Sequence, residues 1–86
     1  MNFENLKSGD LIKIKNQVYE VLYSQIEADI ALPPEYKIRT FLAIYLHKKD
    51  SNSLQPTHQL WYYKDTKEIF LVNAGKKKID LEEIEQ

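Results

Sequence analysis

Two histidines and several carboxylates are the side chains of this chain that could bind a metal ion. His47 and His58 are eleven residues apart and fall in different expected strands, so a site needs both imidazoles to converge with a carboxylate such as Asp50 or Glu35. The chain has no cysteine, which excludes thiolate ligands, thiol nucleophiles and disulfides. The histidine spacing matches no metal-site signature, and we therefore predict no metal site.

Nucleophilic and acid–base catalysis have equally little support in the sequence. None of the serines carries a local nucleophile signature; they are Ser8, Ser24, Ser51 and Ser53. No sequence spacing supports a catalytic triad of one of these serines with His58 and Asp65. The adjacent acids Glu82 and Glu83 lie in an acidic C-terminal segment, where solvation explains them. We predict that the protein is not an enzyme and uses no cofactor.

Aromatic side chains make up 12% of the residues and are the feature with the clearest binding potential. If the strands described below form, one sheet face carries Arg39, Phe41, Tyr45, Trp61 and Tyr63. Rings beside cationic groups stack on nucleic-acid bases or pack against a protein partner. The alternative is that this face is a second small core, closed by Ile26, Ile30 or Leu81.

Two functions remain open from these residues. The formal net charge is −1, with 12 basic and 13 acidic side chains, which gives no global argument for nucleic acid or for a membrane. We expect a protein partner or a homo-oligomer, bound through the aromatic face. The alternative partner is single-stranded RNA, bound by the rings together with basic side chains. The predicted binding residues are Arg39, Phe41, Tyr45, Trp61, Tyr63, Lys13 and Lys15.

The first element that must position these groups is a hairpin over residues 11–24. A two-residue turn at Asn16 and Gln17 pairs Ile14 with Tyr19 and Ile12 with Val21, which places four apolar side chains on one face. The same register opposes Lys13 to Glu20 as an ion pair. Asn16 suits a turn residue with positive φ, although no glycine follows it, so the turn type stays open.

Residues 6–14, which contain Leu6-Lys7-Ser8-Gly9-Asp10, and residues 18–22 resemble the opening of the N-terminal barrel domain of the elongation factor P family. The match covers about a fifth of the chain. In that family the next loop is rich in glycine and holds a modified lysine. Here the corresponding residues 25–36 contain neither glycine nor lysine. The resemblance therefore implies a small β-barrel fold without that activity.

The middle of the chain predicts an apolar loop followed by a long strand. Pro33 and Pro34 exclude regular structure around them, so we expect residues 26–32 to form an irregular arm or one helical turn. A functional loop is the alternative. Residues 37–47 alternate without a breaker and carry apolar side chains on both faces, so this strand must bend or be covered on its second face. Residues 48–56 are predicted to be a polar loop.

The last third predicts two further strands, at residues 57–63 and 69–73, joined by a polar turn. In the first of these, Trp61 and Tyr63 face away from Leu60 and Tyr62. Lys76 to Lys78 are typical of an exposed turn. Asp80 and Glu83 form a pattern like a capping box, which predicts a short helical turn within residues 80–84 and then an edge segment, with a short closing strand as the alternative.

These elements together predict an all-β fold. The 86 residues make one domain, 1–86, which we expect to be a small five-stranded antiparallel barrel of the SH3-like kind. No apolar run approaches the roughly 20 residues that span a bilayer, and the N-terminus has no signal-peptide pattern. We therefore expect a cytoplasmic location and no membrane contact.

Overall fold

A single antiparallel sheet organises the computed structural model, which describes residues 2–30, 38–52 and 55–86. Within these residues the strands are β1 (Leu11–Ile14), β2 (Gln17–Ile30), β3 (Ile38–Lys48), β4 (His58–Tyr63), β5 (Glu68–Asn73), β6 (Gly75–Ile79) and β7 (Ile84–Glu85). Their order across the sheet is β6-β5-β4-β3-β2-β1-β7. Two short 3-10 turns, η1 (Phe3–Asn5) and η2 (Leu81–Glu83), accompany them.

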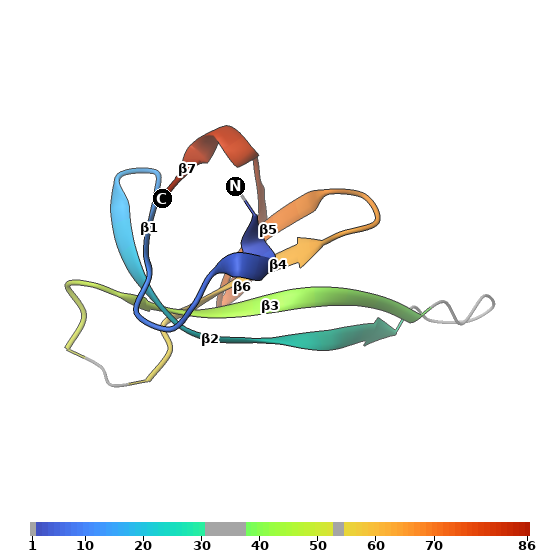
Figure 1. Ribbon diagram of the computed structural model, residues 1–86, viewed down its shortest axis with the longest axis horizontal. Coiled ribbons are helices and arrows are strands. Elements are labelled where there is room, and N and C mark those ends of the chain that lie inside the picture. Colours follow the sequence, from blue (N-terminus) through green and yellow to red (C-terminus); the bar gives the residue numbers. More distant parts are fainter. Residues whose placement is uncertain (1, 31–37, 53–54) are drawn as a thin grey trace.

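The sheet curls strongly and stays open along one side, which makes it a half-barrel (Figure 1). The prediction of an all-β antiparallel fold is confirmed. The predicted number of five strands is wrong, because β6 and β7 extend the described sheet at its two ends to seven.

The turn between β1 and β2 lies one residue earlier than predicted. Lys15 and Asn16 are its central residues, with φ of 48° and 69°, the left-handed values that a type I′ hairpin turn requires at both positions. Ile12 therefore pairs with Tyr19, and Lys13 pairs with Val18 rather than with Glu20. Because moving the turn by one residue changes the pairing by two, the apolar residues keep their face while the predicted ion pair is lost.

β2 and β3 form a long two-stranded hairpin that extends beyond the rest of the sheet (Figure 1). The expected irregular arm or helical turn is wrong for residues 26–30, which are strand and pair with β3 as far as Ile30 opposite Ile38. Residues 31–37, including Pro33 and Pro34, lie outside the described residues. The long strand predicted at 37–47 is confirmed as β3.

A register shift in β2 between Val21 and Tyr23 changes which residues face inward. Tyr19 and Val21 lie in the inner core, whereas Tyr23 and the odd-numbered residues after it lie opposite the outer-facing residues of β3. The concave, inner face holds the larger core, whose buried members are Phe3, Leu6, Ile12, Ile14, Tyr19, Val21, Ile44, Leu46, Leu60, Ile69, Ile79 and Ile84.

The C-terminal segment closes one end of the half-barrel. The Asp80 N–H donates to Glu83 Oε2 at 3.0 Å, the contact that the predicted capping pattern requires, and the predicted helical turn is confirmed as η2. Ile84 then pairs with Ile14, so β7 is the expected edge segment. The lysine run is not a turn, because Lys76 to Lys78 lie within β6 and pair with β5.

Candidate binding face

Five aromatic side chains pack together on the outer face of the sheet, and we call this group the ring face: Phe41, Tyr45, Trp61, Tyr63 and Phe70. Tyr23 of β2 stacks on Tyr45 at the border of this group, with ring centroids 4.5 Å apart. The ring centroids of Phe41 lie 4.5 Å from Trp61 and 5.0 Å from Tyr63, and Tyr63 meets Phe70 edge to face at 5.6 Å. Phe41 and Tyr63 are buried, whereas Trp61 and Phe70 are half-buried. Strand alternation causes this grouping, because facing positions of β3, β4 and β5 share one side.

Two cations lie over these rings. The Arg39 guanidinium carbon is 4.2 Å from the centroid of Tyr63. Lys76 Nζ is 4.4 Å from the centroid of Phe70 and 5.4 Å from that of Trp61. All three distances fall in the range of cation–π attraction. The ring face is therefore covered in part by charges from its own chain, rather than by Ile26 or Leu81, which are 69% and 49% exposed. The side chain of Ile30 lies outside the described residues.

Carboxylates border the ring face along β2. The Tyr63 hydroxyl donates to Asp29 Oδ2 at 3.1 Å, and the Tyr45 hydroxyl donates to Glu27 Oε2. Burial and then the Asp29 contact raise the pKa of Tyr63 to about 12. The bond to Glu27 and then burial raise the pKa of Tyr45 to about 12. Both phenols therefore stay neutral donors at physiological pH.

Arg39 also pairs with Asp65 in the turn before β5 and with Glu68, the first residue of β5. Its Nη2 is 3.4 Å from Asp65 Oδ1 and 3.2 Å from Glu68 Oε1. The Thr66 hydroxyl and then Arg39 hold the pKa of Glu68 below its ordinary value. The positive charge of Arg39 is thus balanced by neighbouring carboxylates before any ligand is considered.

The two lysines of the predicted site lie apart from the rings. Lys13 lies opposite Val18, on the part of β2 that precedes the register shift, and opposite Glu85 of β7. Lys15 lies in the hairpin turn, and its Nζ is 3.5 Å from Glu83 Oε1. The structure therefore brings together Arg39, Phe41, Tyr45, Trp61 and Tyr63, but neither Lys13 nor Lys15.

Sequence reasoning missed five contributors to this face: Tyr23, Glu27, Asp29, Phe70 and Lys76. Strand alternation predicts Tyr23 on the opposite face, because the register shift in β2 has no signal in the sequence. Phe70 had a usable signal, because it alternates with Ile69 and Leu71 in a strand next to Trp61. Lys76 had none, because its position depends on β6 pairing with β5. Glu27 and Asp29 were missed because the sequence predicts an irregular arm at residues 26–32, where β2 in fact continues to Ile30.

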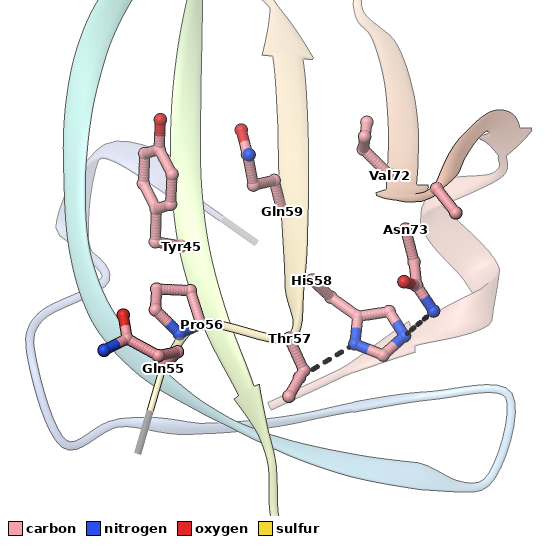
Figure 2. Close-up of a pocket in the computed structure, with 9 residues that line it drawn as sticks. Tyr45, Gln55, Pro56, Thr57, His58, Gln59, Val72 and Asn73 are labelled. Carbon is pink, nitrogen blue, oxygen red and sulfur yellow. Dashed lines mark hydrogen bonds between the residues drawn. The ribbon is translucent and has the colours of Figure 1, made fainter. Parts of the chain in front are cut away.

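A shallow pocket of about 260 Å³ adjoins the ring face at Tyr45 (Figure 2). His58 lies at this pocket between two polar groups. Its Nδ1 is 2.9 Å from Thr57 Oγ1, and its Nε2 is 3.1 Å from Asn73 Nδ2. Because the Asn73 amide nitrogen can only donate, these contacts fit a neutral imidazole protonated at Nδ1. Burial and then the charge of Lys48 hold the pKa of His58 below its ordinary value.

We predict that this arrangement makes the protein less stable in mild acid. A folded-state pKa below the unfolded value means that the unfolded chain binds the proton first, so the contribution of His58 is full above its unfolded pKa and is lost as pH falls. Urea unfolding at about pH 7.5 and about pH 5.5 measures this loss, in a range above the carboxylate pKa values. His58→Gln should reduce this loss of stability on acidification. His47→Gln leaves His58 in place and should lose as much stability as the wild type. An unchanged pH dependence in His58→Gln would contradict the prediction.

Among the described residues, no three His, Asp or Glu side chains lie close enough together to hold a metal ion. The described part of the chain also contains no helix with the length and apolarity needed to cross a membrane.

No family model, curated protein sequence or solved structure matches this chain.

Proposed function

We propose that this chain is a non-enzymatic binding module that associates with another protein through the ring face. The observation that carries the proposal is the position of Trp61, half-buried between Phe41 and the Lys76 ammonium. Its Nε1 donates to Gln59 Oε1 at 2.9 Å, so the indole is held in place. Fixed tryptophan and tyrosine rings with a charged border are the features that dominate protein interfaces.

The border of the ring face favours protein over nucleic acid as the partner. Glu27 and Asp29 lie along one side of the rings, and Arg39 is paired with Asp65 and Glu68. Carboxylates at these positions repel phosphates, whereas a protein partner can present groups of both signs to them.

We also propose that the curled sheet is a variant of the SH3-like barrel. The support is the opening hairpin β1–β2, which carries the segment resembling elongation factor P and contributes Ile12 and Ile14 to the inner core. In this proposal, β6 and β7 are additions at the two ends of the sheet.

Peptides selected from a random library on the wild-type protein test the binding proposal. We expect Trp61→Ala to weaken these peptides by at least about tenfold, because it removes the centre of the face. Trp61 is half-buried, whereas Phe41 and Tyr63 below it are buried, so we expect the variant to fold, and circular dichroism checks this. Leu11→Ala is the matched control. Leu11 is 48% exposed on β1, away from the rings, so this variant should bind the selected peptides as the wild type does.

Salt separates the two classes of partner. Peptide binding through apolar rings should persist from about 0.05 M to about 0.5 M salt, whereas RNA binding falls steeply over that range. Amide NMR spectra with a mixed single-stranded RNA pool provide the comparison. RNA-induced shifts centred on β3 and β4 that vanish with salt, or selected peptides that ignore Trp61→Ala, would contradict the proposal.

A further inference from the structure

The outer half of β2 has an edge that no described strand covers. β1 pairs with β2 only from Gln17 to Glu20, and the chain before β1 covers one residue more. There the Val21 N–H donates to the Asp10 carbonyl and the Val21 carbonyl accepts from the Gly9 N–H, both at 2.8 Å. From Leu22 to Ile30, β3 lies on one side of β2, and no strand among the described residues lies on the other side. Such an edge presents unpaired backbone donors and acceptors to a further strand.

We propose that a second copy of this chain pairs with this edge, β2 against β2, to form a two-fold symmetric dimer with a continuous antiparallel sheet. The seam lies beside the ring face and shares its bordering carboxylates Glu27 and Asp29, but it is formed by backbone pairing of β2 rather than by the rings, so the inference goes beyond the proposed function. In a two-fold symmetric antiparallel pair, one residue of β2 lies directly opposite the same residue of the second copy, at the symmetry axis. The uncovered stretch from Leu22 to Ile30 has its midpoint at Ile26, and pairing centred there uses its full length.

The side chains on this edge fit the register centred on Ile26. The two Ile26 side chains, each 69% exposed in the single chain, then lie opposite each other and lose contact with water. Glu27 lies opposite Gln25 of the second copy, and Asp29 lies opposite Tyr23. No like charges face each other across the seam. Centring the pair on Glu27 would instead oppose two carboxylates, which disfavours that register.

The contact between Gln25 and Glu27 supports the same register. Within one chain, Gln25 Nε2 donates to Glu27 Oε2 at 2.9 Å, so an amide donor and a carboxylate acceptor already lie on one face of the edge. In the dimer each Gln25 lies directly opposite the other chain's Glu27, where the same groups can bond across the seam.

The other long edge of the described sheet has the opposite character. β6 lies at the end of the strand order and carries three consecutive exposed lysines, Lys76 to Lys78. Antiparallel self-pairing of β6 centred on any one of these lysines would oppose lysine to lysine, and lysines are a common means of blocking edge association. Of these two edges, therefore, β2 is the one suited to pair with its own copy.

Cross-linking through single introduced cysteines tests the register directly, because the natural chain has no cysteine. Ile26→Cys places two thiols on directly opposed residues, whose Cα atoms are about 4.5–5.5 Å apart, within disulfide range. Ser24→Cys and Ala28→Cys are matched controls on the same strand and face, but their thiols lie about 14 Å apart along the strands of the dimer. Mild oxidation should cross-link Ile26→Cys at least about tenfold faster than either control.

Equilibrium sedimentation from about 10 µM to about 1 mM measures the dimer itself. Gln25→Glu should raise the dimer dissociation constant by about tenfold, since each new carboxylate faces Glu27 of the other chain. Gln86→Glu makes the same change at an exposed C-terminal residue and should leave the constant unchanged.

Several results would overturn the inference. A monomer over the whole concentration range excludes the dimer. Equal cross-linking of Ile26→Cys, Ser24→Cys and Ala28→Cys excludes the register. Open-ended oligomers that Lys77→Glu suppresses would show β2 pairing with the basic β6 edge. A dimer that Trp61→Ala dissociates and Gln25→Glu leaves intact would place the contact on the ring face, which supports the proposed function and not this inference.

Discussion

Replacing Tyr63 with alanine is expected to lower the free energy of unfolding by about 3–5 kcal/mol, the range for deleting a fully buried aromatic side chain. Tyr63 is 1% exposed and lies between Phe41 and Phe70, with the Arg39 guanidinium over its ring. A small domain has a total stability of the same order, so Tyr63→Ala should be substantially unfolded at room temperature. Urea titration followed by circular dichroism measures the loss.

Tyr63→Phe separates the ring from its hydroxyl. This variant keeps the contacts with Phe41, Phe70 and Arg39 and loses the hydrogen bond to Asp29, so we expect a cost of about 0.5–1.5 kcal/mol. Similar losses in Tyr63→Ala and Tyr63→Phe would mean that the outer rings contribute little packing energy. The ring face would then not be a second core under a binding surface.

Replacing Ile79 with alanine is expected to cost about 2–4 kcal/mol, because its side chain is 4% exposed in the inner core. Ile79 is the buried residue of β6, whose other members Gly75 to Lys78 are exposed. We expect amide hydrogen exchange to accelerate throughout β6 in this variant, since the lysines have no other apolar anchor within the strand.

Leu81→Ala is the control for Ile79. It truncates an aliphatic side chain two residues away that is 49% exposed, so the expected cost is below about 1 kcal/mol. Equal effects of Ile79→Ala and Leu81→Ala, or unchanged exchange in β6, would show that the backbone pairing with β5 alone holds this edge.

Much of the sheet follows from alternation that is visible in the sequence. The strands β3, β4 and β5 were predicted within one or two residues, because apolar side chains recur with period two on both faces. The same period placed Phe41, Trp61 and Tyr63 on one side. The turn at η2 was also predictable, since the Asp80 and Glu83 spacing is a local signal that needs no distant partner.

Three elements could not be predicted in this way. The lysines of β6 have no apolar alternation, and their strand exists because β5 supplies hydrogen-bonding partners and the core takes Ile79. The sequence predicts an irregular arm where β2 continues, because Pro33 and Pro34 follow, whereas pairing with β3 keeps residues 26–30 extended. The turn at Lys15 and Asn16 lacks the glycine that usually marks positive φ.

The sequence by itself determined an all-β antiparallel chain with two apolar faces and a set of rings on the outer one, because strand alternation is a local property. Tertiary structure decided the number of strands, the hairpin register and the neighbours of the rings. It placed Lys76 and Asp29 beside Trp61 and Tyr63 and left Lys13 and Lys15 elsewhere. The physical reason is that strand pairing and sheet curvature are set by contacts between distant segments, and these carry no signal within one segment.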